Sequence, residues 1–143
     1  MVDLAEIARK HYFHPSTKGS CSIKKVLPAV LQSSAFLRNT YGKPIYGAEG
    51  GVPSLNFNGV AWWQQSVDGV VMDPYELLIA EFGPEGEEAE RVNQGGAASN
   101  AYLRLQFEDL PPEVRVGLRR GLLRYCELDT LAMGLILQSW LHG

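Results

Sequence analysis

A long helical stripe of apolar residues near the C-terminus constrains the fold more than any other feature of the chain. Steps of three and four residues follow one face of a helix. From position 114 onward, that face carries Val114, Leu118, Leu122, Tyr125, Asp129, Ala132, Ile136 and Trp140. The stripe predicts a helix from about residue 112 to residue 141, and its apolar side requires cover from the rest of the chain.

Helical spacing and capping residues also predict shorter helices earlier in the chain. The predicted segments are a helix over 3–13, a helix after Ser22 with a kink or break at Pro28, and a further turn over 35–41 closed by Gly42. A short helix from Asp73 onward and a helix around 98–105 follow, the latter with Ala98, Ala101, Tyr102 and Leu105 on one stripe. Residues 43–72 instead hold frequent glycines, prolines and scattered aromatics, with at most a short hairpin around Asp68 and Gly69. We therefore predict a mainly α fold of five or six helices with an irregular middle.

Length, composition and charge fit one globular domain spanning residues 1–143. Hydrophobic residues make up 45% of the chain and charged residues 20%, which argues against a disordered protein. The net charge of −3 gives no overall attraction to nucleic acid or to an anionic membrane, although a local basic face could still bind nucleic acid. The chain has two distant cysteines, no secretory leader and no apolar run that could span a bilayer, which predicts a cytoplasmic protein without a membrane segment.

Asp129 is the one acidic residue on the otherwise apolar stripe. A buried carboxylate is costly without a partner, so Asp129 must be paired, hydrogen-bonded, exposed at a cleft or bound to a cation. Tyr125 precedes it by one helical turn, and a phenol beside a carboxylate could orient the water of a bound metal ion such as Mg²⁺. The spacing leaves a structural alternative open, in which Asp129 caps a neighbouring helix or pairs with an arginine.

The residues around this pair resemble a known nuclease motif. Positions 123–133 read Leu-Arg-Tyr-Cys-Glu-Leu-Asp-Thr-Leu-Ala-Met, which is similar to the third motif of DEDD-type 3′-to-5′ exonucleases, in the subgroup with Tyr-x-x-x-Asp. These enzymes share the ribonuclease-H-like fold. Over nearly its whole length the chain also resembles a bacterial family of larger uncharacterised proteins, a domain of unknown function, through its stretches at 12–28, 44–47, 73–75 and 95–98.

The exonuclease resemblance implies a metal-dependent role for Asp129 and Tyr125. In that superfamily, four carboxylates hold two metal ions that clamp the attacking and leaving oxygens of a phosphodiester. Asp129 matches the last carboxylate, a metal ligand, and Tyr125 matches the tyrosine that orients the water. The first motif, Asp-x-Glu, occurs nowhere in the chain. The aspartate of the second motif has no counterpart either, because Asp3 is better explained as a helix cap.

These departures predict that the chain is the C-terminal portion of a longer exonuclease-like protein, corresponding to the helical end of a ribonuclease-H-like domain. One carboxylate cannot hold two metal ions, so the chain alone is expected to carry no metal cofactor and to leave nucleic acid intact. The full-length protein is expected to use Mg²⁺ or Mn²⁺ on DNA or RNA. A helical portion without its sheet would expose apolar surface, which predicts a homodimer.

Four arginines give the first half of the last helix a basic side: Arg115, Arg119, Arg120 and Arg124. Arg119, Arg120 and Arg124 are candidates for phosphate contacts with nucleic acid. A solvated helix face that pairs with Glu113 and Glu127 explains the same residues equally well. The second functional hypothesis is accordingly a non-catalytic helical module that binds a partner protein or nucleic acid.

Overall fold

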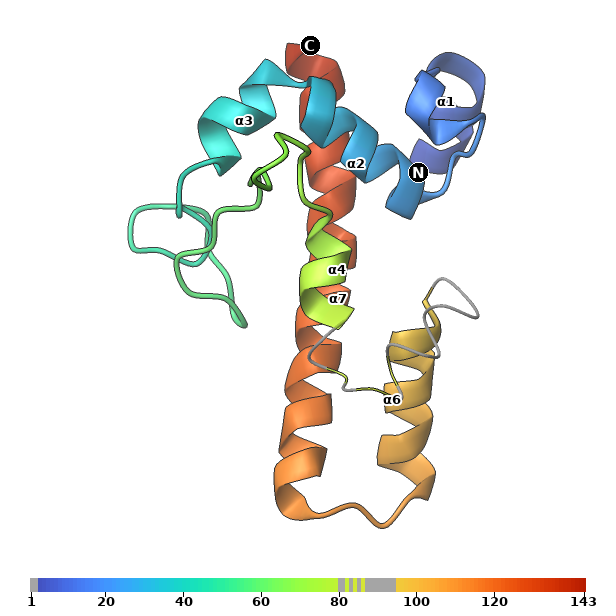
Figure 1. Cartoon of the computed structure of the whole chain (residues 1–143), viewed down its shortest axis with the longest axis vertical. Coiled ribbons are helices and arrows are strands. Elements are labelled where there is room, and N and C mark those ends of the chain that lie inside the picture. The colour runs from blue at the N-terminus through green and yellow to red at the C-terminus, as the bar shows by residue number, and fades with distance from the viewer. Residues whose placement is uncertain (1–2, 80–81, 83, 85, 87–94) are drawn as a thin grey trace. The chain divides into compact units, whose positions relative to one another are not determined.

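The computed structural model of the chain describes residues 3–79, 82, 84, 86 and 95–143 (Figure 1). The α-helices formed by these residues are α1 (Leu4–His11), α2 (Ile23–Ser33), α3 (Ala35–Tyr41), α4 (Pro74–Ile79), α6 (Gly96–Phe107) and α7 (Pro112–His142). The mainly α fold predicted from the sequence is confirmed. Isolated β-bridges take the place of strands in the described part of the chain. No helix of this part is both long and apolar enough to cross a membrane.

The chain divides into two compact units. Unit 1 consists of residues 1–73 and 129–143, and unit 2 consists of residues 74–128. Helices α1, α2 and α3 belong to unit 1, whereas α4 and α6 belong to unit 2. Helix α7 contributes its first part to unit 2 and its part from Asp129 onward to unit 1.

Helix α1 begins and ends with hydrogen bonds that its sequence explains. The Asp3 carboxylate accepts a hydrogen bond from the backbone N–H of Ala5 at 2.9 Å, which confirms the predicted cap. At the other end, the N–H of Tyr12 donates to the carbonyl of Ala8 at 3.1 Å. The helix therefore ends at His11, short of the predicted end near residue 13, and Tyr12 is extended. His14, which precedes Pro15, is also extended, as expected for a residue before proline.

The proline inside α2 does not divide the helix. Helix α2 continues through Pro28 to Ser33, so the predicted break at this position is not observed. A proline removes one N–H from the helical ladder, and the neighbouring turns of α2 supply buried apolar side chains that hold the helix in place. Helix α2 ends before Ser34, whose hydroxyl accepts a hydrogen bond from the N–H of Leu37 at 3.3 Å and so caps α3. Helix α3 then spans Ala35–Tyr41 and is followed by Gly42, as predicted.

The irregular segment 43–72 is packed by its own aromatic side chains. Tyr46, Phe57 and Trp62 are all buried. Their ring centroids lie 4.9 to 5.8 Å apart with edge-to-face geometry, which is a favourable arrangement for aromatic rings. This cluster explains how a long segment without helices or strands keeps a defined course in unit 1.

Two hydrogen bonds join the end of this segment to α2. The indole N–H of Trp63 donates to the carbonyl of Leu31 at 2.8 Å, and the N–H of Val71 donates to the side-chain oxygen of Gln32 at 3.3 Å. Between them, an antiparallel bridge pairs Gln65 with Val71 and closes a turn through Gly69, which has a φ of 76°. This turn is the short hairpin predicted around residues 68 and 69.

The C-terminal part of α7 is the central helix of unit 1. Its residues Ala132, Leu135 and Ile136 are buried, as the apolar stripe predicts for the first and last of them. Three further contacts connect it to the rest of unit 1. They are the hydrogen bond from the Tyr41 hydroxyl to Gln138 at 2.9 Å, the stacking of Phe36 on His142 and the contact of Tyr12 with Trp140.

Unit 2 contains a helical hairpin in which α6 lies antiparallel to the first part of α7 (Figure 1). The Arg115 guanidinium joins the two helices by donating to the carbonyl oxygens of Leu105 at 3.2 Å and Glu108 at 3.4 Å. The buried face of α6 is formed by Ala97 and Ala101.

This face agrees only in part with the predicted stripe of Ala98, Ala101, Tyr102 and Leu105. Ala101 is buried and Ala98 and Leu105 are half-buried, but Tyr102 is 55% exposed. Residues 97 and 101 satisfy the same helical spacing as residues 98 and 102. The structure buries the pair with the smaller side chains, which permits closer packing of the helix.

We expect the hydrogen bond between Tyr41 and Gln138 to stabilise unit 1 measurably. Tyr41 is almost fully buried, so Tyr41→Phe removes a donor and leaves the oxygen of Gln138 without it. The expected loss is about 1 kcal/mol in the free energy of unfolding, measured by urea denaturation. Tyr102→Phe is the matched control, because this hydroxyl is on the surface, and it should change stability by less than about 0.5 kcal/mol. Equal losses in the two variants would contradict this role of Tyr41.

Candidate functional site

Asp129 is half-buried on α7. The next positions of the stripe, Ala132 and Ile136, are buried and apolar, so the carboxylate occupies an otherwise apolar face as predicted. A carboxylate at such a position requires either a structural partner or a functional reason. Its partial exposure leaves it accessible to solvent.

Tyr125 is part of the hydrophobic core of unit 2. Only 4% of its surface is exposed. Its ring centroid lies 5.5 Å from that of Tyr75 and 5.9 Å from that of Phe82, with both contacts edge to face. The packing of these three rings is sufficient to explain an aromatic residue at this position. The stripe predicted that Tyr125 faces inward, but its aromatic partners from the region of α4 were not predicted.

The spacing of Tyr125 and Asp129 is preserved in the structure, because α7 is an uninterrupted helix through both positions. Residues four apart in a helix follow each other by one turn on the same face. Tyr125 belongs to unit 2 and Asp129 belongs to unit 1.

The candidate arginines of α7 lie in different environments. Arg119 and Arg120 are exposed, and neither forms a hydrogen bond or an ion pair with another described residue. Arg124 is half-buried, and Arg115 donates to carbonyl oxygens of the neighbouring hairpin helix. Arg119 and Arg120 are therefore the members of the predicted basic side that are available to an anionic partner.

Neither cysteine is in a disulfide: Cys21 is half-buried and Cys126 is exposed. In the part of the chain that the structure describes, no group of three or more histidine, cysteine, aspartate or glutamate side chains is placed to hold a metal ion.

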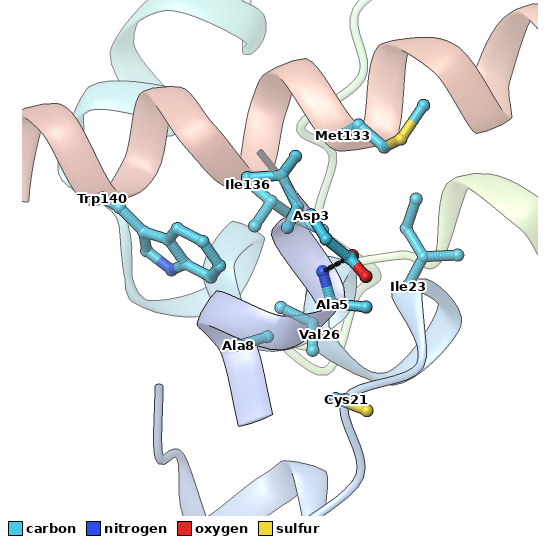
Figure 2. Close-up of a pocket in the computed structure, with 10 residues that line it drawn as sticks. Asp3, Ala5, Ala8, Cys21, Ile23, Val26, Met133, Ile136 and Trp140 are labelled. Carbon is cyan, nitrogen blue, oxygen red and sulfur yellow. Dashed lines mark hydrogen bonds between the residues drawn. The ribbon is translucent and has the colours of Figure 1, made fainter. Parts of the chain in front are cut away.

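Unit 1 contains a pocket of about 540 Å³ that the sequence did not predict (Figure 2). Its apolar lining comes from three helices: Leu4, Ala5 and Ala8 of α1, Ile23 and Val26 of α2, and Met133, Ile136 and Trp140 of α7. Asp3 and Cys21 complete the lining. These residues are far apart in the sequence and meet only in the folded unit, so no motif could have indicated the pocket.

Two buried polar atoms lie in the aromatic contact that involves Trp140. The indole nitrogen of Trp140 and the hydroxyl of Tyr12 are both buried and have no hydrogen-bond partner among the described residues. Their rings are 5.5 Å apart at the centroids. Burial raises the pKa of the Tyr12 hydroxyl above its ordinary value, because the charged phenolate would lose its hydration. Because the indole nitrogen is inaccessible, Trp140 contributes ring carbons to the pocket surface.

Comparison of the chain with known protein families, with curated proteins and with solved structures finds no match.

Ring packing, rather than the hydroxyl group, should account for most of the structural contribution of Tyr125. Tyr125→Ala removes the ring between Tyr75 and Phe82 and should cost about 3–5 kcal/mol in the free energy of unfolding. Tyr125→Phe retains both ring contacts and should cost no more than about 1 kcal/mol. Denaturant unfolding of the two variants measures the difference. Equal losses would mean that the hydroxyl dominates and would contradict the packing role.

Proposed function

We propose that this chain supplies the last carboxylate of a metal-dependent 3′-to-5′ exonuclease-like site. In this proposal Asp129 is a metal ligand and Tyr125 orients the attacking water. The observation that carries the proposal is the position of Asp129, a half-buried carboxylate on an otherwise apolar face of α7. It follows Tyr125 by one helical turn, and both lie within residues 123–133, which resemble the third exonuclease motif. The substrate would be DNA or RNA.

The packing of Tyr125 fits this role for the ring, whereas the hydroxyl is buried and would have to be reached by the water within the complete site. A residue that orients a water molecule must itself be held in one position by its surroundings. Tyr75 and Phe82 both contact the Tyr125 ring edge to face and restrict its motion. The same contacts also give the ring a structural function.

The residues described do not form a complete site for two metal ions. Such a site uses several carboxylates to hold Mg²⁺ or Mn²⁺ on both sides of the scissile phosphate. Here Asp129 is the single matching carboxylate, and no cluster of three candidate ligands occurs in the described residues. We therefore assign no catalytic step to the chain alone. The full-length exonuclease-like protein would have to supply the remaining ligands.

Asp129 should nevertheless bind a divalent cation weakly. Millimolar Mn²⁺ should broaden the amide NMR signals of residues adjacent to Asp129, because a paramagnetic ion relaxes nearby nuclei. Asp129→Asn removes the charge with little change in size and should abolish this local broadening. The same preparation should leave single-stranded DNA and RNA intact, since the metal site is incomplete.

Glu127→Gln is the control for this experiment. It removes a carboxylate two residues away on a different face of α7, so the broadening around Asp129 should persist. Broadening that is unchanged in Asp129→Asn would rule out Asp129 as a metal ligand. Metal-dependent digestion that disappears in Asp129→Asn would show that the chain forms a complete site, contrary to the proposal.

A specific surface feature favours a second candidate function, a non-catalytic helical module. Val116, Arg119, Arg120 and Leu123 share one side of α7 at helical spacing, and all four are exposed. In the same unit, Tyr102, Leu103 and Phe107 are exposed on α6. Arginine and aromatic side chains are enriched at binding surfaces, and both also contact single-stranded nucleic acid. The module would bind nucleic acid or a partner protein, including a second copy of the chain.

The nucleic-acid form of this candidate predicts a salt-dependent effect. The double variant Arg119→Gln/Arg120→Gln should weaken binding of single-stranded oligonucleotides. It should also reduce the slope of log affinity against log salt by about 0.7 for each phosphate that the variant no longer neutralises. Fluorescence anisotropy at several salt concentrations measures both quantities. Arg38→Gln, an exposed arginine on α3 in unit 1, should change neither. Equal effects of the two variants would indicate nonspecific charge attraction and contradict a site on α7.

A further inference from the structure

We propose that the pocket of unit 1 binds a small monocationic amphiphile, an apolar chain that carries a protonated amine. The proposal concerns residues other than Tyr125 and Asp129 and does not depend on the exonuclease-like role. It rests on the size of the pocket, the apolar character of its walls and the sign of the one charged group among the described residues that line it.

The pocket has the size and lining of a small-molecule site. Its volume of about 540 Å³ lies within the range of roughly 300–1,000 Å³ that is common for such sites. Eight of the ten lining residues that the structure describes are apolar or aromatic. An alkyl chain placed between α1, α2 and α7 would remove both its own surface and these side chains from water. Met133 has a flexible side chain that can adjust to such a chain.

The charge of the pocket selects the head group of the ligand. Among the described residues that line the pocket, Asp3 is the acidic one, and none is a lysine, arginine or histidine. The other polar member is the thiol of Cys21, and the indole nitrogen of Trp140 is buried away from it. A cationic group is therefore attracted to the pocket, and an anionic group of the same length is repelled.

The exposure of Asp3 determines how the ligand would lie. Figure 2 shows Asp3 held by its hydrogen bond to Ala5, in a pocket that it shares with Ile23 and Ile136. Asp3 is exposed to solvent. The ammonium group would remain hydrated beside this carboxylate while the alkyl chain enters the apolar part. Ion pairs in such exposed positions are weak, so the head group should change affinity modestly and the chain should contribute most of it.

Three ligands with the same alkyl chain separate these contributions. Octylammonium, octanol and octanoate, each below its micelle concentration, are titrated into the full chain and followed by calorimetry. Octylammonium should bind saturably and about threefold to fivefold more tightly than octanol, which corresponds to a weak exposed ion pair. Octanoate should bind most weakly. Amide NMR shifts should concentrate on Ala5, Ala8, Val26 and Ile136.

Asp3→Asn tests the charge while preserving the helix cap, because asparagine and aspartate cap helices about equally well. The affinity for octylammonium should fall to that for octanol in this variant. Glu6→Gln is the matched control, since Glu6 lies in the same helical turn, pairs with Lys10 and does not line the pocket. It should leave all three affinities unchanged.

Ala5→Phe tests the cavity itself. Ala5 is exposed and lines the pocket, so a larger side chain can enter the space without displacing the core. Binding of octylammonium should fall at least about tenfold while the circular dichroism spectrum stays unchanged. Ile23→Trp provides a second filling variant if Ala5→Phe fails to fold. Equal affinities for the three ligands, no effect of Asp3→Asn, or no saturable binding of octylammonium would each overturn the proposal.

Discussion

Burial of the apolar face of α7 is the constraint on which both units depend, because each unit uses its own part of this helix as core. In unit 1 the buried residues include Ala132 and Leu135, and in unit 2 they include Leu118, Tyr125 and Leu128. Burial of one large apolar side chain contributes about 1.5–3 kcal/mol relative to its exposure. The short helices and the irregular segment bury too little surface to be stable alone. Packing within their units holds them in defined conformations.

Periodicity and capping predict the helical part of this structure well because both are local properties. The span of α7, the cap at Asp3 and the turn at Gly69 depend on neighbouring residues and agree with the structure. Of the two outcomes predicted at Pro28, a kink or a break, the break does not occur, and its absence has a tertiary cause. A proline disfavours a helix interior locally, but buried neighbours such as Leu27 and Leu31 hold α2 together through this position. Where tertiary packing contributes more free energy than local helix propensity, the packing determines the structure.

For the site residues Tyr125 and Asp129, the sequence predicts which side of the helix they lie on but not their tertiary contacts. The stripe shows that Tyr125 faces inward, and the aspartate on it is noticeable as the one polar member. The contacts of Tyr125 with Tyr75 and Phe82 join positions separated by more than forty residues, which helical spacing does not report. The pocket is even harder to predict from the sequence. Residues from the first and last helices line it, and ordinary apolar side chains in an amphipathic helix carry no sign that a cavity lies between them.

Asp3 illustrates how one carboxylate can serve both the fold and a ligand. A carboxylate has two oxygens with several acceptor positions, and the cap of α1 uses Oδ1 for the N–H of Ala5. That hydrogen bond orients the side chain before any ligand arrives. An ordered side chain loses less conformational entropy on binding than a freely rotating one. Folding has therefore already removed part of the entropy that Asp3 would otherwise lose when it forms the ion pair. The stability of the helix start and the selectivity of the pocket are therefore linked through the same residue.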